Sequence, residues 1–358
     1  MENITINTKM FSSALKRLKE IAGGQTMTGE TIRFDVSNTE MKMTVRGAHG
    51  TTMMVMLPVM NLGEPAAFVV DSKKLSSIIP QVNCEDITLM KARSGLRISG
   101  GGLKMELPYF ELSSFREVGR LTDPEMACTV SADEFKEKIA STVHALAINR
   151  TGEKVSTFYV EFTDDGIRMT TTDERRIAIH GPKGEPVSGI MLPNEAIRKV
   201  AKYFSGDITI KKVEDTVEIA DDSTVLTINA LAGNYFNIAK VVQAMEPGCT
   251  YWVTVKKGEL LRSLEMSLAM DRENCLLTVA DEALYVTAKN AEGAFQQVIE
   301  AESNTGNEDK KAFLNAQYLV DAIRSLKEDT VTIRFGNVRT PFILSEEGAT
   351  EILFLKNA

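Results

Sequence analysis

The chain has 358 residues, of which 43% are hydrophobic and 25% are charged. A chain of this length exceeds what one hydrophobic core usually supports, so two or three domains are expected, and the composition excludes a disordered or fibrous protein. The formal net charge is −8. Taken as a total, this charge argues against nucleic acid as a partner, because phosphate binding depends on Lys and Arg.

The amino terminus and the cysteines give expectations about compartment and metal binding. Residues Met1 to Met10 lack the charged-then-apolar layout of a signal peptide, and no run approaches the roughly 18 apolar residues of a membrane span. We therefore expect a cytoplasmic protein with no membrane partner. The four scattered cysteines predict reduced thiols rather than a disulfide framework or a zinc site: Cys84, Cys128, Cys249 and Cys275.

Helical and extended patterns follow one another in a recurring order. A first amphipathic helix is predicted over residues 9–22, and an apolar strand at 68–70 leads into a second helix over 72–82. A strand at 86–89 follows, and then the strands 95–99 and 103–107, which alternate apolar and polar residues as in a sheet with one buried face. The same order returns with helices over 132–147 and 193–204, and again with helices over 256–272 and 315–327.

These elements recur at a nearly constant spacing. Val70, Leu192 and Leu314, each at the end of a strand that precedes a helix, are separated by 122 residues in both intervals. A period of this size is that of a whole domain rather than of a solenoid repeat. The sequence therefore predicts three tandem copies of one α+β domain, each with two helices on an antiparallel sheet, over residues 1–124, 125–246 and 247–358.

The six predicted helices differ from the rest of the chain in charge. Together they carry +8, so the remainder carries −16. If the helices share one surface, that surface is basic and would attract the phosphates of duplex DNA without reading its sequence. The simpler interpretation, that Lys and Arg only decorate the solvent faces of amphipathic helices, is disfavoured by the threefold repeat. Helix positions alone nominate these residues for DNA contact: Lys16, Lys19, Lys74, Arg198, Lys199 and Lys202.

Three segments resemble the bacterial DNA polymerase III beta subunit, or beta sliding clamp, in an order and spacing that cover essentially the whole chain. Residues 171–178, T-T-D-E-R-R-I-A, are similar to the family's A-T-D-G-H-R-L-A segment. Residues 233–242, G-N-Y-F-N-I-A-K-V-V, are similar to its F-P-x-Y-x-x-V-x-P segment, and residues 315–323, N-A-Q-Y-L-V-D-A-I, match its third domain.

The resemblance implies a non-enzymatic homodimer whose six domains close into a ring around duplex DNA and tether the replicative polymerase for processivity. Gln25, Lys73 and Arg150 match positions on the inner side of such a ring. Contact of the first domain with the third domain of the other subunit would close it. The interface candidates, for which a place in the core of one domain is an equal alternative, are Leu103, Met105, Leu268 and Met270.

The family also binds short peptides of polymerases, clamp loaders and repair proteins in an apolar pocket between its second and third domains. Such a pocket buries peptide Leu and Phe side chains, each contributing roughly 1.5–3 kcal/mol. The matching positions are Thr172, Arg175, Arg176, Ile177, Phe236, Val241, Leu353 and Leu355.

The chain departs from the family at several of these places. Glu174 and Arg175 replace Gly and His, Phe236 replaces Pro, and the terminal I-L-F-L-K-N-A replaces M-P-M-R-L. The peptide preference is therefore expected to differ, as in a divergent or phage-encoded clamp.

Residues that suggest an enzyme are few. His49, His144 and His180 share no motif, and the pairs Asp164–Asp165 and Asp221–Asp222 are typical of turns. No catalytic residue, metal site or cofactor is predicted. Two alternatives stay open: a triplicated β-rich hydrolase or sugar-binding protein, which would show turnover without DNA, and a monomeric scaffold that recruits peptides without encircling DNA.

Overall fold

The structure is a computed structural model that describes residues 3–22, 31–115, 118–150, 153–280, 282–304, 310–336 and 341–355. Contacts between residues divide the chain into two compact units. Unit 1 contains residues 1–133 and 198–230, and unit 2 contains residues 134–197 and 231–358. The division passes through two helices, α3 (Ala132–Thr142) and α4 (Asn194–Tyr203).

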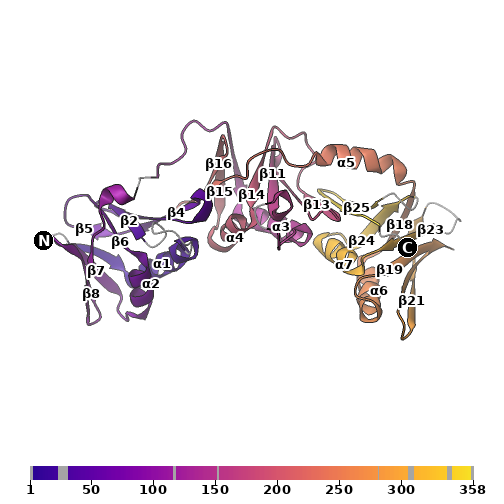
Figure 1. Ribbon diagram of the computed structural model, residues 1–358, viewed down its shortest axis with the longest axis horizontal. Helices are drawn as coiled ribbons and strands as arrows, with labels where there is room; N and C mark the ends of the chain where they lie inside the picture. The colour runs from indigo at the N-terminus through magenta and orange to yellow at the C-terminus, as the bar shows by residue number, and fades with distance from the viewer. Residues whose placement is uncertain are drawn as a thin grey trace. The chain divides into compact units, whose positions relative to one another are not determined.

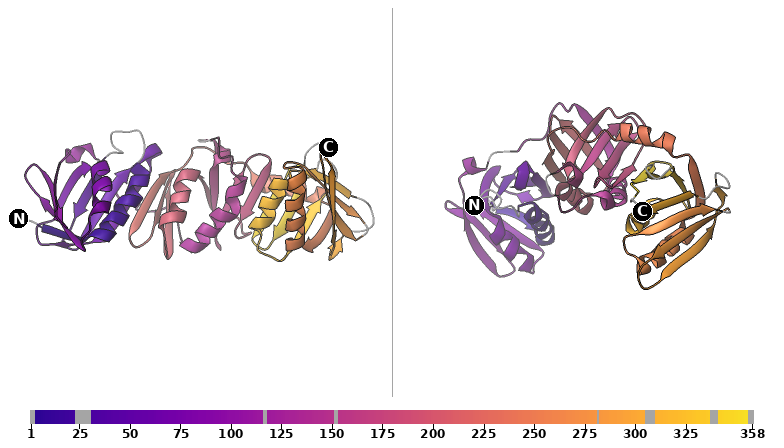
Figure 2. Two further views of the ribbon diagram at one scale, coloured as in Figure 1. Left: turned by 90° about the horizontal axis from the view of Figure 1, so that it is seen from below. Right: turned by 45° about the vertical axis from the view of Figure 1, so that its right-hand side comes forward.

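Unit 1 contains two antiparallel sheets (Figure 1). The first has the strand order β5 (Met60–Asn61), β1 (Asn3–Asn7), β7 (Asp86–Lys91), β8 (Gly95–Gly100) and β9 (Leu103–Pro108). The second has the order β10 (Met126–Ser131), β15 (Asp207–Val213), β16 (Thr216–Ala220), β17 (Thr224–Asn229), β4 (Thr52–Pro58), β3 (Glu40–Arg46), β2 (Thr31–Val36) and β6 (Ala66–Asp71). Helices α1 (Thr8–Ala22) and α2 (Ser72–Ile78) contact each other and lie against the strands (Figure 2).

Unit 2 also contains two antiparallel sheets. The larger has the order β14 (Ser188–Pro193), β11 (Thr157–Thr163), β12 (Gly166–Thr172), β13 (Arg176–His180), β26 (Ala349–Leu353), β25 (Phe342–Glu346), β24 (Thr330–Phe335), β18 (Tyr251–Lys256) and β22 (Ser303–Asn304). The smaller has the order β21 (Ala294–Glu300), β20 (Ala283–Lys289), β19 (Cys275–Ala280) and β23 (Lys310–Leu314). Its helices are α5 (Ile238–Met245), α6 (Lys257–Met270) and α7 (Ala316–Ser325), together with most of α3.

The strand-to-helix steps repeat as the sequence predicts. Strands β6, β14 and β23 each lead into a helix, as do β1, β10 and β18. Asp71 and Asn315 cap their helices by accepting hydrogen bonds from the backbone N–H groups of Lys74 and Tyr318. The predicted α+β class with repeated domains is confirmed.

Two predicted helices are shorter in the structure. The helix predicted over 72–82 ends at Ile78 and continues as a 3-10 turn, because Pro80 lacks the N–H that an α-helix needs. The helix predicted over 132–147 ends at Thr142, whose hydroxyl donates to the Lys138 carbonyl. Helix α5 lies in a segment where the sequence predicted none of the six helices.

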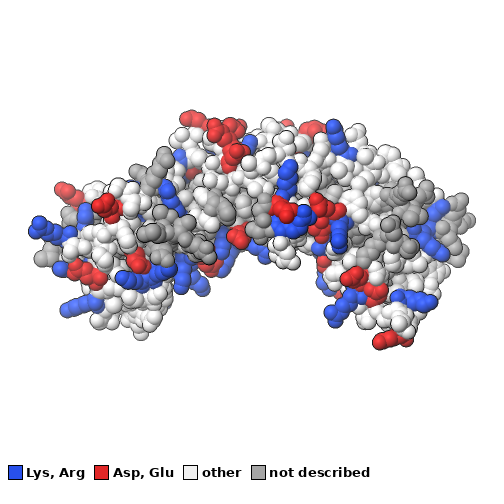
Figure 3. Space-filling model, in the orientation of Figure 1, with Lys and Arg blue, Asp and Glu red and all other residues white. Residues whose placement is uncertain are grey.

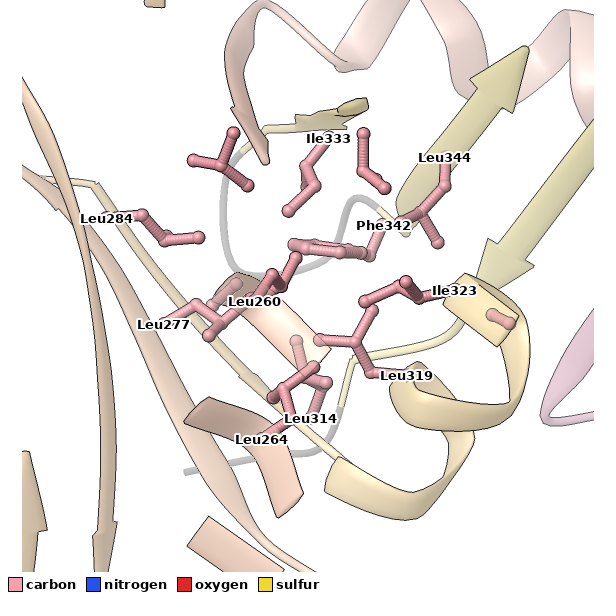
Figure 4. Packing of buried hydrophobic residues seen from close by; sticks show 14 of the residues in the cluster. Leu260, Leu264, Leu277, Leu284, Leu314, Leu319, Ile323, Ile333, Phe342 and Leu344 are labelled. Carbon is pink, nitrogen blue, oxygen red and sulfur yellow. The ribbon is translucent and has the colours of Figure 1, made fainter. Parts of the chain in front are cut away.

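Each unit has its own apolar core, and Figure 4 shows part of the core of unit 2. Leu319 and Ile323 from α7 and Leu260 and Leu264 from α6 lie on one side of Phe342, and Ile333 and Leu344 lie on the other. Burial of each such side chain contributes roughly 1.5–3 kcal/mol, so these contacts fix α6 and α7 on the strands. No described helix has the length and apolar character that crossing a membrane requires.

Candidate nucleic-acid interface and partner pocket

Unit 1 brings together seven of the residues predicted to contact DNA. Helix α1 buries Phe11, Leu15 and Leu18, so Lys16 and Lys19 lie on its exposed face. The others lie on α2 and on the unit 1 part of α4: Lys73, Lys74, Arg198, Lys199 and Lys202. Figure 3 shows Lys and Arg gathered over α1 and α2, and acidic side chains gathered over one end of β15 and β16. This is the separation of charge that the predicted DNA surface requires of unit 1.

Two of these lysines are held by one carboxylate. Lys202 Nζ lies 2.5 Å from Glu20 Oε1, and Lys199 Nζ lies 3.2 Å from Glu20 Oε2. The hydrogen bond from Lys202, then the nearby Tyr203 hydroxyl and the hydrogen bond from Lys199, lower the pKa of Glu20 to about 2, against the opposing effect of burial. The hydrogen bond to Glu20 also raises the pKa of Lys202. Both partners are therefore charged at neutral pH.

The remaining two predicted DNA residues are not on these helices. Arg150 belongs to unit 2, where its guanidinium lies 2.5 Å from Glu153 and 2.8 Å from Glu174. The hydrogen bonds that Arg150 donates to the carboxylates of Glu153 and Glu174 raise its pKa. Gln25 lies outside the described residues.

The predicted partner pocket corresponds to an apolar cluster between α5 and the large sheet of unit 2. Ile177 of β13 and Val241 of α5, both predicted, lie in this cluster. Its other members include Ile238, Ile343, Ile352, Val242, Tyr235 and Phe354. A cavity of about 860 Å³ borders it and is lined in part by Phe236, Ile238, Val242 and Ile343. Phe236 is 37% exposed, and the ammonium group of Lys154 lies 6.0 Å from the centre of its ring.

Two predicted pocket residues face the other side of the sheet. Strand β13 pairs with β26 so that Ile177 lies opposite Ile352 and Arg176 lies opposite Leu353. Because side chains alternate along a strand, Leu353 points into the core of unit 2, and Leu355 packs against that core. Ile352 and Phe354 take their places beside α5. Alternation along the terminal strand separates Ile352 and Phe354 from Leu353 and Leu355, but only the pairing with β13 shows which two lie beside α5.

The turn before β13 is held by its own polar side chains. Thr172 Oγ1 donates to the Arg176 carbonyl at 2.7 Å and accepts from the Glu174 N–H at 3.0 Å. Glu174 has φ 70°, a conformation that favours glycine, and the clamp family has glycine here. Arg175 is exposed, so it is available to a ligand at this turn.

Arg176 is occupied by contacts within unit 2. Its guanidinium donates to Asp173 at 3.1 Å and to Asp321 at 2.9 Å, and it lies 4.0 Å from the centre of the Tyr318 ring. Arg176 therefore ties β13 to α7 rather than lining the cluster beside α5.

Two of the predicted interface residues lie on an edge strand, and the other two lie on α6. Leu103 and Met105 are half-buried on β9, which ends its sheet. Leu268 packs against the core of unit 2, and Met270 is half-buried at the end of α6. Strand β21, which the sequence prediction did not include, ends the four-stranded sheet and exposes 49% of Val298.

The described histidine side chains belong to a buried hydrogen-bond network in unit 2. Glu351, which is fully buried, lies 3.1 Å from His144 Nε2 and 2.9 Å from His180 Nε2, and accepts from Ser325 Oγ at 2.8 Å. These bonds satisfy a buried carboxylate that would otherwise be strongly unfavourable. Within the described parts of the chain, no group of three or more His, Cys, Asp or Glu side chains could hold a metal ion.

Comparisons with known proteins agree with this architecture. Residues 250–355 match the family described as DNA polymerase III beta subunit, C-terminal domain. The beta sliding clamp of Rickettsia bellii is 20% identical over 307 residues, which cover 80% of each chain, and that of Staphylococcus aureus strain Mu50 is 20% identical over 81% of this chain and 79% of its own. The crystal structure of the DNA polymerase sliding clamp from Bacillus subtilis superposes with a TM-score of 0.85 at 16% identity, covering 100% of this chain and 99% of that one.

Repeated α+β domains whose sheets join edge to edge define the DNA-clamp class of proteins. The resemblance to the beta sliding clamps that the sequence predicted, a family within this class, is confirmed. Residues 250–355 match the C-terminal domain of the DNA polymerase III beta subunit, and over 80% of its length the chain is similar to a beta sliding clamp, which supports a divergent clamp of this type.

Proposed function

We propose that this protein is a DNA sliding clamp, a homodimeric ring that encircles duplex DNA and tethers a polymerase to it. The observation that carries this proposal is the shared surface of α1, α2 and α4 in unit 1, which presents Lys16, Lys19, Lys74 and Arg198. Attraction between these cations and the DNA backbone is diffuse and independent of sequence, which suits a protein that moves along DNA.

The strand order supports a specific way of closing the ring. Each of the three predicted domains contributes two groups of four strands, to which the two-residue strands β5 and β22 are added in the first and third domains. The groups join at β17 with β4 and at β26 with β13. By strand order, β9 corresponds to β17 and β26, while β21 corresponds to β4 and β13. In this proposal β9 of one copy pairs with β21 of the other. Two copies then form two identical contacts and no further copy can add.

The cluster beside α5 is the proposed site for partner peptides. Ile177, Val241, Ile352 and Phe354 offer apolar contact, and Phe236 and Arg175 are exposed at its margin. A short segment with adjacent Leu and Phe side chains, from a polymerase or a clamp loader, fits such a surface. In this proposal the chain works through binding alone, in the cytoplasm, with its three domains over 1–124, 125–246 and 247–358.

One experiment tests the ring directly. The protein is loaded by a bacterial clamp loader and ATP onto nicked circular DNA, and the DNA is then linearised. We expect retention on the circle and rapid loss after linearisation, because only a closed ring is linked topologically. Equal rates of loss from both forms, or a monomer by size in solution, would instead support a scaffold that recruits peptides without encircling DNA.

A further inference from the structure

Glu20 occupies an unusual position among the basic helices of unit 1. It is the single acidic residue of α1, and its side chain reaches across to α4. There it bonds Lys202 at 2.5 Å and Lys199 at 3.2 Å, one lysine to each carboxylate oxygen. Glu20 is 27% exposed and Lys202 is 52% exposed, so this cluster is open to solvent and to a ligand.

Neighbouring side chains hold the carboxylate in place and keep it ionised. The Lys202 ammonium group lies 5.1 Å from the centre of the Tyr203 ring, and the nearby Tyr203 hydroxyl also lowers the pKa of Glu20. Arg17 lies with its guanidinium 6.0 Å from the centre of the Tyr203 ring and donates to Thr224 Oγ1 at 3.4 Å. Since the pKa of Glu20 is about 2, the ion pairs persist throughout the physiological pH range.

We propose that Glu20 competes with the DNA backbone, because its carboxylate holds Lys199 and Lys202 in ion pairs that must open before either ammonium group can bind a phosphate. Carboxylate and phosphate oxygens accept the same charge-assisted hydrogen bonds from lysine, so one can replace the other. This inference rests on the proposed sliding-clamp function and specifies how firmly the same surface holds DNA. Glu20 acts as a positioning residue that keeps the attraction weak enough for movement along the duplex.

The competition has a signature in the salt dependence of DNA binding. Each phosphate neutralised by a protein cation steepens the plot of log K against log salt by about 0.9. Lysines that stay in ion pairs with Glu20 do not bind a phosphate, so they do not contribute to that slope. Releasing both should steepen it by roughly 1.8, which is about a tenfold larger change in affinity between about 50 and 200 mM salt.

The test compares the wild-type protein with Glu20→Gln, using the binding of a fluorescent short linear duplex measured by anisotropy over a salt series. We expect Glu20→Gln to bind more tightly at low salt and with the steeper slope. The matched control is Asp222→Asn, which makes the same change in net charge at an exposed turn of unit 1. This control should leave the slope unchanged.

A second pair of variants distinguishes competition from a structural role. Lys202→Gln should leave the slope nearly unchanged in the wild-type background but reduce it by about 0.9 in the Glu20→Gln background. Equal effects in both backgrounds, or a Glu20→Gln slope equal to that of wild type, would overturn the proposal. If Glu20→Gln fails to fold, a slope that falls by about 0.9 on Lys202→Gln in the wild-type background still overturns the proposal. Retention of wild-type protein on nicked circular DNA is scored separately, so failure of the clamp function is distinguishable from failure of this inference.

Discussion

The Lys and Arg side chains of this protein differ in their ion-pair partners. These partners decide which side chains can contact DNA phosphates. Lys16 and Lys19 extend from the exposed face of α1. Arg150 lies between the carboxylates of Glu153 and Glu174, so its charge is largely neutralised locally. Lys199 and Lys202 share Glu20. A phosphate has to displace a carboxylate from the last three residues but not from the first two.

The acid stability of unit 1 should depend on Glu20. Its folded-state pKa of about 2 lies below the ordinary value of 4.5 because the hydrogen bonds from Lys202 and Lys199 and the nearby Tyr203 hydroxyl favour the carboxylate. A lowered folded-state pKa means that the stabilisation is complete above about pH 4.5 and is lost as the pH falls toward 2. We expect Glu20→Gln to melt below wild type at pH 7, and the difference to shrink between pH 4.5 and 2 in calorimetry. A difference that stays constant over this range, as expected for Asp222→Asn, would refute this account.

The charge of single residues was predictable from the sequence, but their partners were not. The excess of Lys and Arg on the helices is visible in the sequence. Glu20 and Lys199 are far apart along the chain and meet only because α1 and α4 come together in unit 1. A count of charges therefore gives Lys16 and Lys199 equal weight, although only the second is held in an ion pair with Glu20.

At the scale of elements, the pairing of β13 with β26 decides which side chains join the apolar cluster beside α5. The strands, their order along the chain and most helix starts were predictable, because capping residues and apolar periodicity are local signals. The register of β26 is set by tertiary contacts, and a shift of one residue exchanges the two faces of a strand. The sequence predicted Leu353 and Leu355 for a partner pocket, whereas the apolar cluster beside α5 contains Ile352 and Phe354. The short helix α5, with Asn237 as its cap, completes this surface.

Two alanine substitutions, each of which shortens one apolar side chain, test whether partner peptides bind the cluster beside α5. Val241→Ala removes apolar surface from the cluster beside α5, and Leu355→Ala removes it from the opposite face. We expect Val241→Ala to weaken the binding of a synthetic peptide with adjacent Leu and Phe residues by roughly five- to tenfold. Leu355→Ala should leave this affinity within twofold of wild type, as measured by calorimetric titration, although it lowers the melting temperature. If Leu355→Ala weakens peptide binding more than Val241→Ala does, the peptide binds at the residues that the sequence predicted.

At the scale of the whole molecule, the repeat and the sheet junctions carry different information. The 122-residue period was visible in the sequence and predicted three similar domains. The junctions β17–β4 and β13–β26 were not visible, because pairing between distant strands leaves no periodic signal. Strand β9 corresponds to β17 and β26, and β21 corresponds to β4 and β13, which are the strands that pair at these junctions. β9 and β21 are therefore the two strands expected to pair with another copy. The predicted interface residues Leu103 and Met105 lie on β9, whereas Leu268 packs into the core.

The proposed β9–β21 contact predicts that one substitution on β21 opens the ring. Val298 is 49% exposed in the single chain, and pairing with a second copy would cover it. Val298→Lys should raise the dissociation constant of the dimer at least tenfold, because a lysine on an edge strand opposes edge-to-edge pairing. The matched control is Val187→Lys in the same unit, where the valine is 62% exposed and precedes β14. Sedimentation velocity over a concentration series measures both variants. If Val298→Lys dimerises as tightly as wild type, the ring closes through some other surface; if it becomes monomeric while Val187→Lys does not, the repeat of sheet junctions continues from one copy into the next.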